Sequence, residues 1–140
     1  MWNLGSKTRN MIIKRKDYKE IPYTKDNINL YKSPENLLKH ARIGKEVDGI
    51  MLVDKKTNEL IGYVAWEGNY IVALEVISKY RGNGFGDILI KKAIGLGAEK
   101  LSVDKNNIAA RKLYEKHGFK KNNTDLGPKM IEYERSNFNV

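Results

Sequence analysis

The pattern of hydrophobic and polar positions predicts a chain that begins with strands and continues with strands alternating with helices. Runs rich in β-branched, aromatic and other apolar residues predict strands at 10–14, 49–54, 60–66, 70–77, 101–103, from 119 onward and at 130–133, with a loop at 122–128. Apolar residues at helical spacing predict helices at 33–44, 84–97 and 107–117, and the polar stretch 16–29 predicts irregular chain or a poor helix. This order indicates a mixed α/β (α+β) fold.

Segment 70–77 is the expected centre of the sheet. It is apolar nearly throughout, which is typical of a strand covered on both faces. Segments 49–54 and 60–66 flank the polar stretch 55–59, which predicts a hairpin with a longer loop. There is no internal repeat, low-complexity tract or proline-rich linker, so residues 1–140 are expected to form a single domain.

A basic turn with three glycines follows the expected central strand and opens the next helix. Gly82, Gly84 and Gly86 have no side chains, so the backbone can fold tightly and direct successive N–H groups toward an anion. The positive end of the helix dipole adds to this effect, and Arg81 supplies a fork of donors suited to phosphate oxygens. The turn therefore predicts a phosphate site, with a purely structural glycine turn as the alternative.

Two common phosphate-binding motifs do not fit this turn. A P-loop ends in Gly-Lys-Ser/Thr, whereas Gly84 is followed by Phe85, Gly86 and Asp87. The dinucleotide fingerprint requires a third glycine at position 87, where Asp87 would instead place a carboxylate near the pyrophosphate. Asp104 lies at a suitable distance downstream, but the preceding meander is wrong for a dinucleotide-binding half.

Two segments resemble the GNAT superfamily of acetyl-CoA-dependent N-acetyltransferases. Residues 81–86, Arg-Gly-Asn-Gly-Phe-Gly, match the pyrophosphate-loop pattern Arg/Gln-x-x-Gly-x-Gly/Ala. Residues 103–119 resemble the family's Asn-x-x-Ala-x-x-Leu-Tyr-x-x-x-Gly-Phe segment. The matching residues there are Asn107, Ala110, Leu113, Tyr114, Gly118 and Phe119. The resemblance covers residues 60–119 and fades toward the amino terminus.

This resemblance implies a GNAT-type acyl-CoA N-acyltransferase fold, in which helices flank a central mixed, mostly antiparallel sheet. It implies acetyl-CoA as co-substrate and no metal. The pyrophosphate would rest on N–H groups of the glycine turn, and the pantetheine arm would pair with the central strand where that strand separates from its neighbour. The implied cofactor-binding residues are Val76, Ile77, Arg81, Gly82, Asn83, Gly84, Phe85, Gly86, Asn107 and Tyr114.

The resemblance also assigns catalytic candidates. Tyr114 matches the family's tyrosine near the thioester sulfur, where it donates a proton or a hydrogen bond to the departing thiolate; the alternative is a tyrosine that only packs. The attacking amine must lose a proton, and Glu75 or Glu67 could face the cleft as the base, Glu75 being our candidate. Members of the family often work without a dedicated base. Asn107 is expected to contact the pantetheine arm or to cap its helix.

The other aromatic and histidine residues have simpler interpretations. Trp66, Tyr63 and Tyr70 are expected in the core, with the acceptor site as the alternative. His40 and His117 are the only histidines, and neither has metal-ligand neighbours in the sequence. His117 near a helix end is expected to stabilise the helix dipole.

Composition narrows the class of partner. The net charge of +9 favours an anionic partner, but Lys and Arg are spread over the chain, which predicts a solvated basic surface rather than a nucleic-acid patch. The absence of cysteine excludes an acyl-cysteine route and suits a reducing compartment. No window approaches the roughly 18 uninterrupted apolar residues of a membrane span, so we expect a cytoplasmic protein with no membrane partner.

We therefore expect direct acetyl transfer from acetyl-CoA to a primary amine of a small molecule or a protein. The basic chain shows no acidic pocket in its sequence, which favours a neutral or acidic acceptor. A homodimer is compatible with the sequence. The alternative function is a catalytically inactive CoA-binding module, for sensing or interaction, on the same fold.

Overall fold

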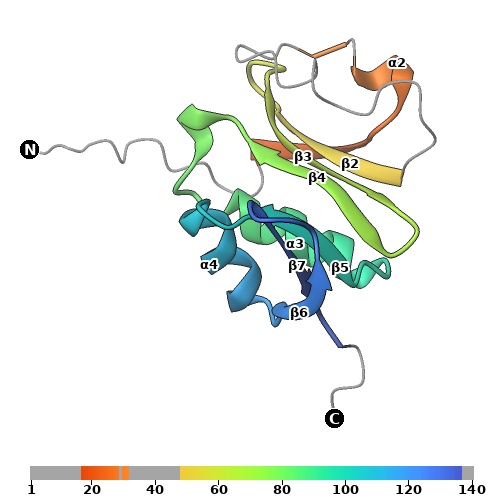
Figure 1. Ribbon diagram of the computed structural model, residues 1–140. Helices are drawn as coiled ribbons and strands as arrows, with labels where there is room; N and C mark the ends of the chain where they lie inside the picture. Colours follow the sequence, from red (N-terminus) through yellow and green to blue (C-terminus); the bar gives the residue numbers. More distant parts are fainter. Residues whose placement is uncertain (1–16, 29, 32–47, 137–140) are drawn as a thin grey trace, which may run out of the picture.

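The computed structural model describes residues 17–28, 30–31 and 48–136, which form one seven-stranded sheet with helices packed on it (Figure 1). The strand expected at 10–14 and the helix expected at 33–44 lie outside the described residues. In chain order the elements are β1 (Tyr18–Pro22), α2 (Lys25–Ile28), β2 (Asp48–Asp54), β3 (Leu60–Glu67), β4 (Tyr70–Val76), the 3-10 helix η4 (Ser78–Tyr80), α3 (Phe85–Gly95), β5 (Lys100–Asp104), α4 (Ile108–Lys116), β6 (Lys120–Asp125) and β7 (Met130–Glu134).

The elements from β2 to α4 confirm the strands and helices predicted there, but the expectation for 16–29 is wrong over β1. This strand pairs antiparallel with β2, from Tyr18 opposite Asp54 to Pro22 opposite Ile50. It is an edge strand with half-exposed side chains, so pairing with β2 stabilises it without an apolar run in its sequence. Only the one-turn helix α2 remains of the expected poor helix.

The carboxyl-terminal hairpin is confirmed, but its loop is shorter than expected. Strand β6 continues through 122–125, and the turn occupies 126–129. The sequence of β6, Lys-Lys-Asn-Asn-Thr-Asp, is entirely polar and its side chains are mostly exposed. No hydrophobic alternation therefore marks β6, which is held by its antiparallel pairing with β7.

Strand β4 is the central strand, as predicted. The strand order is β1-β2-β3-β4-β5-β7-β6, and every neighbouring pair is antiparallel except β4 with β5. This arrangement confirms the expected mixed, mostly antiparallel sheet. The β4-α3-β5 unit is the parallel crossover, so the glycine turn before α3 lies at the carboxyl end of the central strand.

Strands β4 and β5 separate soon after they begin. Their ladder contains two residue pairs, which start at Tyr70 and Ile71 of β4. The β3–β4 register shifts between Ala65 and Trp66, so Val72 is an extra residue of β4, as in a β-bulge. Beyond Ile71 no strand of the described residues pairs with the side of β4 that faces β5, which opens a gap at the centre of the sheet.

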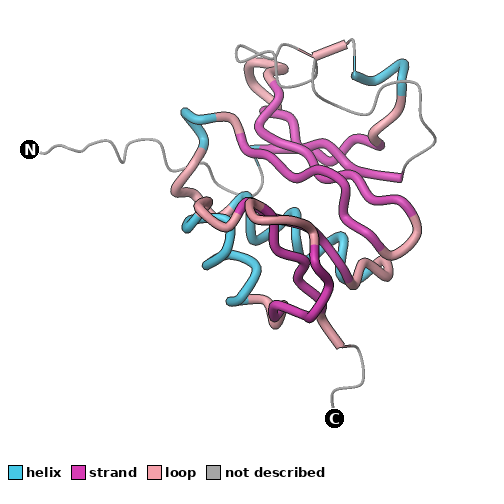
Figure 2. Tube along the Cα trace, in the orientation of Figure 1, coloured by secondary structure: helices cyan, strands magenta, loops and turns pink. Residues whose placement is uncertain are grey.

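Helix α3 covers one face of the sheet, and α4 lies beside it (Figure 2). A Cβ atom on Gly62 of β3 would lie 3.3 Å from Cδ1 of Leu89 in α3. Opposed residues of an antiparallel pair share a face, so Val76, which is opposite Gly62, also faces α3. Glu75 and its partner Tyr63 therefore face the other way.

Glu132 of β7 is a buried carboxylate that accepts hydrogen bonds from neighbouring side chains. Its oxygens accept hydrogen bonds from Nδ2 of Asn122 at 2.8 Å and from the Tyr70 hydroxyl at 3.1 Å. The Asn122 hydrogen bond lowers the pKa of Glu132 below its ordinary value of 4.5. A carboxyl group whose pKa is lowered by folding stabilises the fold above its unfolded pKa. That stabilisation disappears as the pH falls through the folded pKa.

The free energy of unfolding is therefore expected to decrease as the pH falls from about 6 to about 3, and Glu132→Gln should make this decrease shallower. Urea denaturation at a series of pH values measures the effect. Asp48→Asn is the control, because it removes a carboxylate charge from an exposed strand position outside this network. A Glu132→Gln protein that loses stability as steeply as wild type would contradict this account.

Candidate functional site

A pocket of about 500 Å³ opens where β4 and β5 separate. Its walls come from the end of β4, the glycine turn, the first turn of α3 and the amino-terminal two-thirds of α4. The predicted site residues that line it are Glu75, Val76, Arg81, Gly82, Gly84, Phe85, Gly86, Asn107 and Tyr114. The structure thus brings together residues that are widely separated in the sequence.

Two glycines of the turn are required by their backbone conformation. Gly82 and Gly84 have φ angles of 82° and 83°, in the left-handed region that favours glycine. The first helical hydrogen bond of α3 runs from the Ile88 N–H to the Gly84 carbonyl, so earlier N–H groups of α3 have no acceptor within the helix. Among the described residues, no backbone carbonyl accepts from the N–H groups of 82–84. These donors and the helix dipole together favour an anion.

Gly86 has a different role from the other two glycines. It lies inside α3, and a Cβ atom there would lie 3.2 Å from Cδ2 of Leu113 in α4. The missing side chain allows α4 to pack closely against the first turn of α3. This contact brings Leu113 and the adjacent Tyr114 to the pocket wall.

Three predicted cofactor-binding residues make structural contacts. Nε of Arg81 donates to the Val76 carbonyl at 3.0 Å, so the exposed guanidinium folds back over the end of β4. Nδ2 of Asn83 donates to two carbonyls of its own turn at 3.1 and 3.4 Å, and Asn83 does not line the pocket. Ile77 is buried, and its N–H donates to the Ile61 carbonyl at 2.8 Å, which holds the end of β4 to β3.

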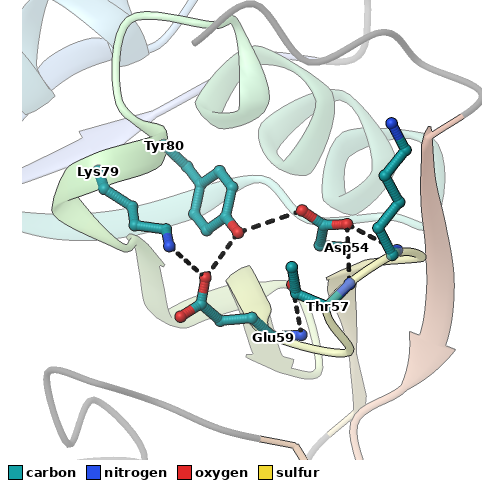
Figure 3. A network of polar contacts seen from close by, with 6 residues as sticks. Asp54, Thr57, Glu59, Lys79 and Tyr80 are labelled. Atoms are coloured by element: carbon teal, nitrogen blue, oxygen red, sulfur yellow. Dashed lines mark hydrogen bonds and ion pairs between the residues drawn. The ribbon is translucent and has the colours of Figure 1, made fainter.

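A polar network fixes η4 and the following turn to the β2–β3 hairpin (Figure 3). The Tyr80 hydroxyl lies 2.7 Å from Oε1 of Glu59 and 3.3 Å from Oδ2 of Asp54. Nζ of Lys79 forms an ion pair with the same Glu59 oxygen at 2.7 Å. Asp54 also accepts the Lys56 N–H at 2.8 Å. The glycine turn is therefore braced by residues that do not touch the pocket, through Tyr80, which does.

Tyr80→Phe is expected to lower the free energy of unfolding by about 1–3 kcal/mol, because it removes the phenol that donates to the largely buried Glu59 carboxylate at 2.7 Å and lies beside the buried Asp54 carboxylate. Urea denaturation measures the change. Tyr31→Phe also removes one phenol oxygen but lies outside this network, and it should change stability by less than about 0.5 kcal/mol. Equal losses in both variants would show that the network does not stabilise the fold.

Tyr114 is a buried polar side chain of the pocket wall, with 7% of its surface exposed. Its ring packs edge-on against Phe119, with centroids 6.2 Å apart. No group of the described residues makes a hydrogen bond to its hydroxyl. Burial and, after it, the negative charge of Glu75 raise the pKa of Tyr114 to about 12. The phenol is therefore protonated at neutral pH and can donate a hydrogen bond.

Glu75 lines the pocket from the sheet face opposite α3. Its negative charge acts on two phenols, those of Tyr63 and Tyr114. For each of them burial is the larger cause of the raised pKa, and the charge of Glu75 is the next. Glu67, the other candidate base, is exposed at the end of β3 and lines neither this pocket nor the smaller hollow beside it. Of the two candidates, Glu75 is therefore the one at the site.

A smaller hollow of about 180 Å³ lies along the same gap. It is lined by Tyr70, Ile71, Val72, Ala73, Leu74, Leu101, Ser102 and Tyr114. Leu74 and Tyr114 line both hollows, so the two spaces meet at these side chains. Of the aromatic candidates for an acceptor site, Tyr70 lines the smaller hollow, whereas Tyr63 and Trp66 are buried in the core.

Several residues of the larger pocket were missed by sequence reasoning. They are Leu74, Tyr80, Asp87, Ala109, Ala110 and Leu113. The helical spacing of Ala110, Leu113 and Tyr114 is the signal that could have found part of this set, because residues three and four apart share one face. Asn107 caps α4, which was one of the two expectations: Oδ1 accepts the Ala110 N–H at 3.1 Å. The residue also lines the pocket.

The described ranges contain neither a cluster of metal ligands nor a membrane-spanning helix. No group of three or more His, Cys, Asp and Glu side chains is placed there to hold a metal ion. No helix among these residues is both long and apolar enough to cross a membrane.

Comparison with known proteins identifies a matching family and similar folds. A family model, Acetyltransferase (GNAT) family, matches residues 15–119. The fold is similar to Arabidopsis thaliana NAA60 in complex with a bisubstrate analogue (TM-score 0.59, 17% identity, 83% of this chain and 94% of that chain covered). It is also similar to the same plant protein in complex with acetyl-CoA (0.57, 16%, 83% and 95%) and to the apo form of YjaB from Escherichia coli (0.59, 18%, 84% and 96%). No curated protein matches the chain.

Proposed function

Because the chain belongs to the acetyltransferase (GNAT) family, we propose that it binds acetyl-CoA in the larger pocket and transfers the acetyl group to a primary amine. One arrangement carries this proposal. The unpaired N–H donors of the glycine turn and the protonated Tyr114 hydroxyl belong to the wall of the same pocket. An anionic group and a reacting group can therefore be held by one ligand that spans this wall.

The residues present fit such a donor in their chemistry. The turn at 82–84 and the amino terminus of α3 suit a pyrophosphate, with Arg81 as an additional cation at the pocket rim. The β5-facing side of β4 beyond Ile71 has no strand partner, so its backbone groups can pair with the amides of an extended arm. Ala110 and Leu113 supply an apolar wall opposite that edge.

Acetyl-CoA supplies the acetyl group as an activated thioester. Tyr114 presents its O–H to the place where negative charge develops on the leaving sulfur. The pKa of Tyr114 is about 12 and that of a free thiol is about 8.5, so the phenol stabilises the thiolate by a hydrogen bond and keeps its own proton. Glu75 is the group at the pocket that can accept the proton lost by the attacking amine.

The amine is proposed to approach through the smaller hollow. The donor occupies the larger pocket, and the two spaces meet at Leu74 and Tyr114, where the reacting atoms would lie. The polar side chains of Tyr70 and Ser102 line this approach. A hollow of about 180 Å³ admits the amino end of an acceptor, whose remaining part extends to the surface.

Release of CoA from acetyl-CoA in the presence of an amine tests the proposal. The panel contains cationic, neutral and acidic primary amines, together with peptides that have a free amino terminus, and the reaction without amine measures hydrolysis. Amine-dependent release with a matching acetylated product supports the proposed function. Calorimetric binding of CoA with no turnover on any amine would instead support an inactive CoA-binding module.

A further inference from the structure

Asp87 places a carboxylate in the wall of the pocket that we assign to the phosphates. The residue lies in the first turn of α3, directly after Gly86, and its side chain is 29% exposed. A negative charge at this position opposes the binding of a pyrophosphate. Asp87 therefore requires an explanation from its other contacts.

Asp87 joins the start of α3 to the end of α4. Its Oδ1 atom lies 2.7 Å from Nε2 of His117 and 3.0 Å from Nζ of Lys116. Partial burial alone would raise the pKa of Asp87, but the hydrogen bonds with His117 and Lys116 outweigh burial and lower the pKa. The carboxylate is therefore ionised at neutral pH and shared by Lys116, the last residue of α4, and His117, which caps that helix.

This junction lies next to Tyr114 along α4. The His117 N–H donates to the Tyr114 carbonyl at 3.0 Å, and the His117 carbonyl accepts from Nε of Arg135 at 3.0 Å. The helices also contact each other where Leu113 packs against Gly86. Leu113 directly precedes Tyr114, and Gly86 directly precedes Asp87. The position of the Tyr114 hydroxyl relative to the glycine turn thus depends on how α4 is fastened to α3.

We propose that Asp87 is a positioning residue that holds α4, and with it the Tyr114 hydroxyl, in place against the phosphate-binding turn. The inference rests on the proposed function. It assigns opposite effects to one charge: the carboxylate weakens binding of the donor, and it fixes the geometry in which the donor reacts. A displacement of about 1 Å in a reacting group can lower a rate by about 100-fold, so a partly loosened helix is sufficient for a measurable effect.

Asp87→Asn separates these two effects. Removal of the charge is expected to increase the affinity for CoA about threefold and to lower kcat about tenfold, because the carboxylate no longer repels phosphate or holds α4. Calorimetry with CoA and steady-state kinetics at saturating acetyl-CoA measure the two quantities. A residue with a merely structural role would lower both together.

Two lysines of α4 provide a matched pair of variants. Lys116→Met removes a cation that contacts Asp87, and it should lower both kcat and the affinity for CoA, since the carboxylate is then less neutralised. Lys112→Met removes the same charge from an exposed position one turn earlier, and it should leave kcat within about twofold of wild type. Equal kinetics for the two lysine variants would overturn the inference, also in the case that Asp87→Asn does not fold.

A double-mutant cycle with Tyr114→Phe shows whether Asp87 acts through Tyr114. If it does, Asp87→Asn should lower kcat in the wild-type background but cause less than a twofold change in the Tyr114→Phe background. A tenfold loss in both backgrounds would overturn the inference and leave the proposed function intact. A wild-type protein that acetylates no amine would overturn both.

Discussion

Gly84→Val is expected to lower the affinity for CoA by about 100-fold, which corresponds to about 2.8 kcal/mol of binding free energy. Gly84 has a φ of 83° as the residue that caps α3, and a β-branched residue is excluded from that conformation by its own backbone sterics. Valine would therefore turn the backbone and move the N–H donors of 82–84 away from a common anion. Calorimetry with CoA measures the loss.

Gly95→Val is the matched control for this substitution. Gly95 is the last residue of the same helix, and a Cβ atom there would meet nothing within 4 Å. Its φ is not in the left-handed region, so valine causes no comparable strain. The control should bind CoA within about twofold of wild type. A folded Gly84→Val protein with wild-type affinity would show that the turn does not hold the phosphates.

Tyr114→Phe is expected to lower kcat by about 100-fold, with the affinity for CoA changed by less than about twofold. Phenylalanine keeps the ring that packs against Phe119 and removes only the hydroxyl, so the fold should be preserved. The loss comes from the hydrogen bond to the leaving thiolate, which forms as the reaction proceeds. Steady-state kinetics together with calorimetry separate the two quantities.

The difference between wild type and Tyr114→Phe should not change with pH between about 6 and 10. The active form of Tyr114 is the neutral phenol, and its pKa of about 12 keeps it neutral throughout that range. The ratio of the two kcat values is measured across the range with one amine. A ratio that approaches one near pH 9 would mean that the phenol ionises there, which would contradict the assigned environment.

The hydrophobic pattern predicts those elements whose own side chains form the core. Strand β3 is buried from Leu60 to Trp66, and α3 buries Phe85, Leu89 and Ala93 at helical spacing. Strands β1 and β6 are different, because ladder hydrogen bonds with β2 and β7 hold them while the side chains of β1 stay half-exposed and those of β6 mostly exposed. No single-residue pattern records such pairing, so one strand was missed and the other was predicted too short.

The candidate site likewise has features that local sequence determines and features that only tertiary packing determines. The conformation of Gly82 and Gly84 is local, so a short motif was enough to predict the turn. The contact of Asp87 with His117 joins positions 30 residues apart, and it exists only because α3 and α4 pack side by side. Spacing along the chain cannot show that a carboxylate near the phosphates has a lysine and a histidine beside it at the end of another helix.

Hydrogen bonds within the protein restrain the glycine turn in the absence of a ligand. Tyr80 connects the base of the turn to the β2–β3 hairpin, and the Asn83 side chain donates to the carbonyls of Tyr80 and Arg81. A segment already restrained in this way has little conformational entropy left to lose when a phosphate docks, so more of the contact energy is retained as affinity. The turn is therefore a preorganised binding site. The association rate of the ligand should be limited by diffusion rather than by closure of a loop.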